Sequence, residues 1–200
     1  MKNTVKNNVD YIKMDTEKIQ EAVLTIIKAI GDDPNRQGLV DTPQRLAEMY
    51  GELLSGVNMD AREVLATGFS AGHHEMVIVR DIPFYSMCEH HFLPFYGTVD
   101  IGYIPNANGW VVGVSKLARV VDIFSRRLQL QERMTKQIAD VIVESLRPDG
   151  VAVVIQAEHL CMTMRGIKKP GSNIVTSANR GIFRQKPATR AEFLSLVQGR

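Results

Sequence analysis

The spacing of hydrophobic residues changes near residue 70, and this change limits the folds that the chain can adopt. Before it, apolar residues recur every three or four positions, which is typical of helices with one buried face. After it, short segments alternate between apolar and polar residues, which is typical of strands in hairpins. Two further segments with helical spacing follow one another as a pair. This order predicts an α+β fold with an antiparallel sheet rather than a parallel wound sheet.

Helices are predicted in both halves of the chain. Thr42 followed by Pro43 marks one start, because a proline in the first turn of a helix loses no hydrogen bond. The predicted helices cover residues 15–31, 42–56, 60–65, 115–124, 131–146 and 189–197. The predicted strands cover residues 75–79, 95–104, 110–114, 150–157 and 175–183. We therefore expect a helical appendage over residues 1–69, beginning with a polar arm, and a main domain over residues 70–200.

The composition is that of an ordinary globular protein of 200 residues, with 44% hydrophobic and 23% charged residues. A formal net charge of +2 indicates neither a nucleic-acid nor a membrane partner. No apolar run approaches the roughly 20 residues of a membrane span, and the polar N-terminus lacks the apolar core of a secretion signal. With only two cysteines, free or metal-bound thiols in a reducing cytoplasm are favoured over a disulfide framework.

The two cysteines each lie close to histidines, and there the sequence predicts a metal site. Cys88 and His91 are three positions apart, so one tight turn can direct both side chains to a common point. Cys161 completes a Cys-His-Cys set if its strand end lies beside that turn. Three protein ligands leave one tetrahedral position open, as in catalytic zinc sites. The alternative is that both cysteines are buried packing residues.

Two further histidines flank the predicted ligands. His90 precedes His91, and His159 precedes Cys161 by two positions. Histidine titrates near working pH, so both are candidates for proton transfer beside the metal. The alternative role for both is to orient the ligands.

Basic residues at several places in the sequence are candidates for binding an anionic substrate: Lys116, Arg119, Arg165 and Arg45. Ser115 stands at a predicted helix start, where a hydroxyl and backbone N–H groups favour an anion. Each cation taken singly also fits a solvated surface. The sequence contains no P-loop motif. Gln131 and Glu132 begin the second long helix, and a carboxylate there suits the N1–H and 2-amino group of guanine.

Several motifs together resemble type I GTP cyclohydrolases. They run from about residue 16 to the C-terminus in the order of that family. The motifs are Asp41-Thr42-Pro43-Gln44-Arg45, Cys88-Glu89-His90-His91-Phe92-Leu93-Pro94-Phe95, Gly113-Val114-Ser115-Lys116-Leu117-Ala118-Arg119, Gln129-Leu130-Gln131-Glu132-Arg133, Cys161-Met162-Thr163-Met164-Arg165-Gly166 and Thr176-Ser177-Ala178-Asn179-Arg180-Gly181.

The resemblance implies a tunnelling fold over residues 70–200, with an antiparallel four-stranded sheet and two packed helices. It implies a homodecamer of two pentamers with active sites between subunits. The implied reaction converts GTP and water to 7,8-dihydroneopterin triphosphate and formate, the entry step of folate or tetrahydrobiopterin synthesis.

The resemblance also implies roles for individual residues. Cys88, His91 and Cys161 would hold Zn²⁺, and Glu132 with Gln131 would recognise guanine. Water would attack C8 of the purine while His159 protonates the neighbouring ring nitrogen. His90 would protonate the ribose ring oxygen, and Ser115 would assist the later rearrangement. Triphosphate would be bound by Lys116, Arg119, Arg165 and Arg45, some of them from an adjacent subunit.

Two other readings give different expectations. Pterin aldolases and a deazaguanine nitrile reductase share the tunnelling fold but lack this Cys-His-Cys set. A zinc-stabilised protein without turnover would need neither His90, nor Ser115, nor the basic cluster.

Overall fold

Four long antiparallel strands form the centre of the structure. The computed structural model describes residues 14–198. The strands lie in the order β2 (Val77–Cys88), β3 (Pro94–Ile104), β6 (Gly150–His159) and β7 (Asn173–Gly181). A two-residue strand, β5 (Leu128–Gln129), adds to the free side of β2 in parallel. The expected α+β fold with a four-stranded antiparallel sheet is confirmed, and β5 is an addition that the sequence did not predict.

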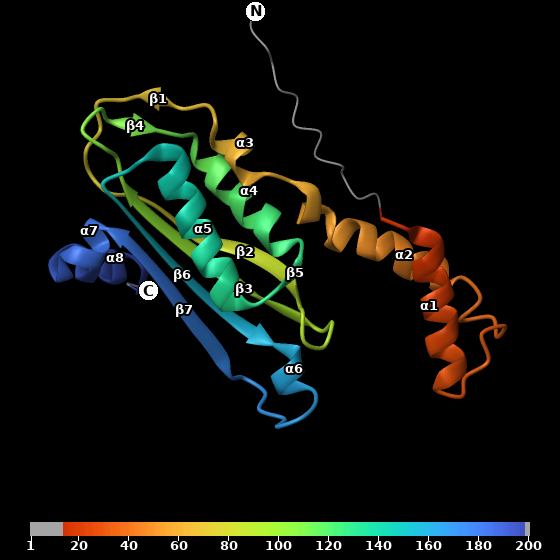
Figure 1. Cartoon of the computed structure of the whole chain (residues 1–200). Helices are drawn as coiled ribbons and strands as arrows, with labels where there is room; N and C mark the ends of the chain where they lie inside the picture. Colours follow the sequence, from red (N-terminus) through yellow and green to blue (C-terminus); the bar gives the residue numbers. More distant parts are fainter. Residues whose placement is uncertain (1–13, 199–200) are drawn as a thin grey trace, which may run out of the picture.

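Helices α4 (Val114–Ser125) and α5 (Gln131–Leu146) lie side by side over one face of this sheet (Figure 1). The predicted apolar stripe of α4 is buried, with Leu117, Val120 and Val121 all at 0% exposure. These residues pack with Met134, Ile138 and Ile142 of α5 and with apolar residues of β3 and β6 in the main core. Complete burial of such a side chain contributes about 1.5–3 kcal/mol, so this layer dominates the stability of the domain.

The C-terminal segment packs against the sheet as a second, smaller core. Helices α7 (Ile182–Gln185) and α8 (Pro187–Gln198) contribute Phe183 and Phe193, which pack with Ala152 of β6. Gly102 of β3 leaves space for the ring of Phe193, because a Cβ there would lie 2.7 Å from that ring.

The N-terminal helices divide into two groups. Helices α1 (Thr16–Ala29) and α2 (Thr42–Leu53) pack together and project away from the sheet (Figure 1). After the short η1 (Ser55–Asn58), α3 (Ala61–Leu65) buries Ala61 and Leu65 in the main core. Strand β1 (Phe69–Ser70) then pairs with β4 (Trp110–Val111). The domain boundary near residue 69 stays a prediction.

Strands β2, β4 and β7 differ most clearly from their predicted extents. Strand β7 ends at Gly181 rather than at residue 183, because α7 begins at Ile182. Strand β2 continues to Cys88 instead of ending at Val79, and a bulge explains the error. The pairing with β3 shifts register between Val79 and Ile82, and Asp81 adopts a left-handed φ of 56°. An inserted residue reverses the side-chain alternation, so the pattern no longer reads as one strand. The strand predicted over 110–114 ends at Val111, because α4 already begins at Val114. Within residues 14–198, no helix combines the length and the apolar character that crossing a membrane requires.

Candidate metal and active site

Cys88 ends β2, and the turn after it directs His91 back toward the cysteine. The Cys88 N–H donates to the Leu93 carbonyl at 2.9 Å, and the Phe92 N–H donates to the Cys88 carbonyl at 2.9 Å. Phe92 closes the turn in the left-handed region, with a φ of 54°. Cys161 lies on the one-turn helix α6 (Leu160–Thr163) that directly follows β6. The ligand atoms of Cys88, His91 and Cys161 all lie within 4.8 Å of one another.

This donor set suits a zinc ion. Thiolate and imidazole are the ligands that zinc prefers, and three of them leave one position open. Arg165 donates an N–H to Nε2 of His91 at 3.0 Å, and a guanidinium only donates, so this nitrogen carries no hydrogen and its lone pair accepts that bond. Burial raises the pKa of the Cys161 thiol, and the nearby Cys88 raises it further. Cys161 must therefore release a proton to bind a metal.

His159 ends β6 and is held on two sides. Its ring stacks on Phe95, with centroids 4.6 Å apart and planes 11° apart. Its Nε2 lies 2.7 Å from Oε1 of Gln131, the first residue of α5. Burial lowers the pKa of His159, and the carboxylate of Glu132 partly offsets this effect. His159 is therefore a neutral imidazole at neutral pH, next to the predicted metal ligands.

His90, His91 and Glu132 are exposed. The rings of His90 and His91 lie edge to face, with centroids 6.3 Å apart and planes 89° apart. Glu132 is exposed in the first turn of α5. It lines a cavity of about 490 Å³ together with Lys136, Ser177, Ala178, Asn179, Arg180, Arg184 and Arg190.

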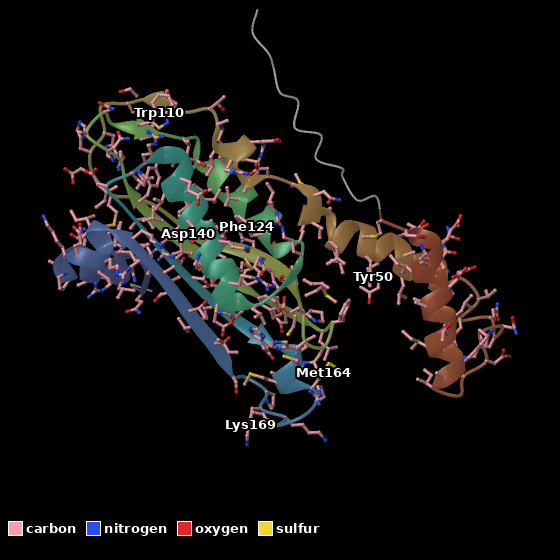
Figure 2. The ribbon with its side chains drawn as sticks, in the orientation of Figure 1. Tyr50, Trp110, Phe124, Asp140, Met164 and Lys169 are labelled. Atoms are coloured by element: carbon pink, nitrogen blue, oxygen red, sulfur yellow. The ribbon has the colours of Figure 1, made fainter. Side chains whose placement is uncertain are left out.

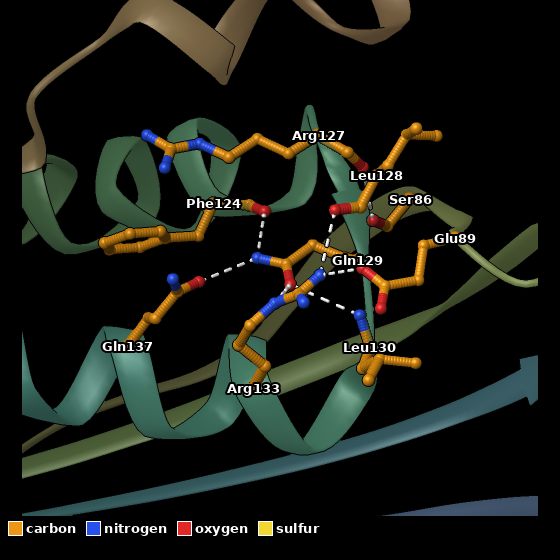
Figure 3. A network of polar contacts seen from close by, with 9 residues as sticks. All are labelled: Ser86, Glu89, Phe124, Arg127, Leu128, Gln129, Leu130, Arg133 and Gln137. Carbon is orange, nitrogen blue, oxygen red and sulfur yellow. Dashed lines mark hydrogen bonds and ion pairs between the residues drawn. The ribbon is translucent and has the colours of Figure 1, made fainter.

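A polar network links the Cys88 turn to the start of α5 (Figure 3). Arg133 of α5 forms an ion pair with Glu89 and donates to Oε1 of Gln129 at 3.0 Å. Gln129, 1% exposed, donates through Nε2 to the Phe124 carbonyl at 3.0 Å and to Gln137 at 2.8 Å. The ion pair with Arg133 holds the pKa of Glu89 below its ordinary value. The residue after the first predicted ligand is thereby fixed to the helix that carries Glu132.

Ser115, Lys116 and Arg119 do not join this group within one chain. They lie in the first turns of α4, which follows β4, whereas the last turn of α4 leads to β5 beside Cys88. At 1.5 Å per residue, Ser115 lies about 15 Å along the helix from its end. Figure 2 shows the same separation, with Trp110 of β4 and Met164 next to α6 at opposite ends of the molecule. The Lys116 amine donates to the Thr67 carbonyl at 2.5 Å.

The two remaining predicted phosphate ligands also lie apart from each other. Arg165 is exposed beside His91, at the metal end of the sheet. Arg45 is exposed on α2 and forms an ion pair with Asp41 at 3.0 Å.

A model of the GTP cyclohydrolase I family matches residues 19–198 of the chain. The chain belongs to this family. A relative named GTP cyclohydrolase 1 from Dehalococcoides mccartyi strain BAV1 is 64% identical over 184 residues, which cover 92% of this chain and 97% of the relative. Another of that name, from Halalkalibacterium halodurans, is 58% identical over 187 residues, covering 94% and 99%. Among solved structures, an archaeosine synthase QueF-like protein aligns with a TM-score of 0.42 and 19% identity, covering 53% of this chain and 93% of its own.

Several residues that build the site of this family member had no predicted role. They are Phe95, which stacks on His159, and the network residues Glu89, Gln129 and Arg133. Gln131, which did have a predicted role, carried a further readable signal, because the helical spacing of Met134 and Ile138 places it on the buried side of its helix. A buried amide requires hydrogen-bond partners, so such a position indicates a polar network even when its members are unknown.

Proposed function

We propose that this chain catalyses the GTP cyclohydrolase I reaction, in which GTP and water give 7,8-dihydroneopterin triphosphate and formate. One observation carries the proposal beyond family membership. The ligand atoms of Cys88, His91 and Cys161 converge within 4.8 Å, and His159 lies two residues from the third ligand. Hydrolysis of a purine ring needs an activated water and a group that transfers protons, which a metal centre and an adjacent imidazole would supply.

We propose Zn²⁺ as the metal, held by Cys88, His91 and Cys161. Bound there, zinc would supply a Lewis acid that makes hydroxide available near neutral pH. The chain's own residues would fix the geometry. The hydrogen bonds of the Cys88 turn orient two ligands, and the junction of β6 with α6 supplies the third.

His159 and Glu132 would act on the purine. The carboxylate of Glu132, exposed at the start of α5, would accept hydrogen bonds from the N1–H and 2-amino group of guanine. His159 would deliver a proton to the ring nitrogen next to C8 as water adds to that carbon. The second attack of water releases formate. His90, which is exposed and lies edge to face with His91, would protonate the ribose ring oxygen.

The triphosphate would be bound by groups from more than one chain. Arg165 lies beside the predicted metal and would act from the same subunit. Ser115, Lys116 and Arg119 lie at the far end of α4, so we propose that a neighbouring subunit supplies them. We assign Arg45 to the same task from α2. This division supports a homo-oligomer with shared sites, and the decamer of the family would provide it. We place the enzyme in the cytoplasm, where Cys88 and Cys161 stay reduced.

Formate release from GTP tests the proposed function directly. We expect about one zinc per chain, stoichiometric formate, and a pterin that becomes fluorescent after oxidation. The control is His159→Ala, which should retain zinc and lose turnover, because His159 is not among the three predicted ligands. Purified zinc-loaded protein that releases no formate from GTP would contradict the proposal.

A further inference from the structure

The side-chain amide of Gln131 links β6 and β7 to the ring of His159, and both its nitrogen and its oxygen form hydrogen bonds inside the chain. The amide nitrogen lies 3.1 Å from the Ile155 carbonyl, 3.0 Å from the Ile174 carbonyl and 3.1 Å from Oγ1 of Thr176. The amide oxygen lies 2.7 Å from Nε2 of His159, and the residue is 1% exposed. A substrate could bind this amide only after these hydrogen bonds had broken.

The partners of Gln131 determine which way its amide faces. Two of them are backbone carbonyls, which only accept, so the group facing β6 and β7 is the NH₂. The third partner, Oγ1 of Thr176, is consistent with this orientation. The Thr135 hydroxyl donates its one hydrogen to the Gln131 backbone carbonyl at 2.7 Å. In its 2.6 Å contact with Thr176, Thr135 therefore accepts the hydrogen bond and the Thr176 hydroxyl donates it. Oγ1 of Thr176 is then left to accept from the amide. The amide oxygen must therefore face His159.

This orientation sets the tautomer of His159. An amide oxygen only accepts, so Nε2 of His159 carries a hydrogen, and in the neutral ring Nδ1 then holds a lone pair. Stacking on Phe95 restrains the plane of the ring. In the described part of the chain, the one buried polar side-chain atom without a hydrogen-bond partner is Oγ of Ser145. Within the described residues Nδ1 of His159 has no hydrogen-bond partner and is not such a buried atom, so it is open to solvent.

We propose that Gln131 is a positioning residue that holds His159 as the Nε2–H tautomer and thereby makes Nδ1 its proton-transfer atom. The proposal rests on the proposed function and changes the part that Gln131 plays in it, leaving recognition of guanine to Glu132. Nδ1 of the neutral ring first accepts a proton from the attacking water, and in the resulting cationic ring both nitrogens carry hydrogen. Release of the Nδ1 proton to the substrate returns the Nε2–H form, so the bond to Gln131 persists throughout and the ring need not turn.

Nitrogen-15 NMR of the zinc-loaded, substrate-free chain, labelled only at histidine, tests the tautomer without any turnover. The His159 signals are identified by their loss in His159→Ala. We expect a protonated Nε2 and an unprotonated Nδ1 in the neutral ring. A protonated Nδ1 with an unprotonated Nε2 would overturn the proposal, whether or not the chain converts GTP. Failure of the proposed function would instead appear as absent formate with the expected tautomer.

Steady-state kinetics separate positioning from substrate binding. Gln131→Met keeps the volume of the side chain and removes its hydrogen bonds. We expect kcat to fall about 10- to 100-fold, a part of what a general acid contributes, while KM for GTP stays within about twofold. In the His159→Ala background the same change should have no further effect, because Gln131 acts through His159. A raised KM with unchanged kcat, or additive losses, would return Gln131 to guanine binding. If Gln131→Met does not fold, the NMR measurement decides alone.

Discussion

At the residue scale, the candidate site depends on the protonation states of Cys161 and His159 before the substrate binds. Burial and the neighbouring Cys88 raise the pKa of Cys161 in the metal-free chain. Burial lowers the pKa of His159 and keeps it neutral. Zinc binding requires thiolates, so Cys161 must lose a proton when the metal binds, whereas His159 is already neutral and loses none.

The first prediction concerns the separation of ligands from proton carriers. Cys161→Ala removes one of three ligands and should abolish both bound zinc and activity. His90→Ala should keep zinc and lose turnover, because His90 is not among the three residues whose ligand atoms converge. Zinc content by elemental analysis, measured beside formate release, distinguishes the two variants. Loss of zinc from His90→Ala would show that this residue supports the metal rather than the reaction.

The second prediction concerns the pH dependence of zinc binding. The pKa of Cys161 is raised in the metal-free chain, so the thiol is protonated at neutral pH and binding must expel that proton. Apparent zinc affinity should therefore rise with pH, by about tenfold per unit for each proton released, and level off above the raised pKa. Competition with a chelator at two pH values between 6 and 8 measures this slope. Equal affinities at the two values would contradict the expected proton release.

At the element scale, the site depends on how β2, β5 and α5 are joined, and Gln129 is the residue that joins them. It accepts from Arg133, which pairs with Glu89, and it donates to Phe124 and Gln137 (Figure 3). A third prediction follows. Gln129→Leu should lower the free energy of unfolding by about 2–4 kcal/mol, because several buried partners lose their hydrogen bonds. It should also speed the loss of zinc to a chelator.

Gln137→Leu is the matched control for this change. It removes one partner of Gln129 but leaves the contact with Arg133 intact. Denaturant unfolding should show a loss of about 1 kcal/mol, with zinc release at the parental rate. Equal zinc release from both variants would show that the network stabilises the fold without holding the Cys88 turn.

A fourth prediction concerns the pairing of β3 with β6 next to His159. Gly97 faces Ala157, and a Cβ at Gly97 would lie 1.9 Å from the Gln156 carbonyl. Gly97→Ala must push these strands apart and should lower the free energy of unfolding by about 1–3 kcal/mol. Gly51→Ala is the control, because its Cβ would meet nothing within 4 Å and helix α2 should gain about 0.5–1 kcal/mol. Thermal unfolding of both variants measures these changes in stability, which should have opposite signs.

Sequence patterns predicted what depends on local spacing. Apolar residues at helical spacing located α4 and α5, and the i, i+3 pair of Cys88 and His91 located the metal turn. The bulge at Asp81 was not readable, since one inserted residue reverses the alternation of β2 and hides its second half. Contacts between distant segments were not readable either. Gln131 and Ile174 are 43 positions apart, and only the folded sheet shows that their hydrogen bond excludes other partners.

At the scale of the whole molecule, the predicted catalytic groups lie at two ends of one chain. Cys88, His91, His159 and Cys161 are at the end of the sheet near α6, and Ser115 is at the start of α4. These two ends are about 15 Å apart along α4, so we expect one chain to supply one of them to a given substrate and a second chain to supply the other. Head-to-tail association of identical chains in a ring can bring one end of each molecule to the opposite end of its neighbour.

The fifth prediction is complementation between inactive variants. Cys161→Ala and Ser115→Ala should each be inactive alone. When the two chains are unfolded and refolded together in equal amounts, roughly one site in four should combine intact halves and recover activity. The control is a mixture of Cys161→Ala with His91→Ala, whose changes fall in the same half and should not complement. Absence of recovery in a mixture shown to contain mixed oligomers would place Ser115 and Cys161 in the same subunit's site.

The edge position of β7 has a consequence for how this protein loses activity. Within the described residues β7 pairs only with β6, and segments with fewer packing partners open locally at a lower free-energy cost. Ile174 and Thr176, which hold the Gln131 amide, both belong to this strand. Fraying of β7 would let the amide swing and the imidazole exchange its tautomer while the main core stays folded. On warming, activity would then be lost at a lower temperature than the global fold, because the edge strand β7 opens first.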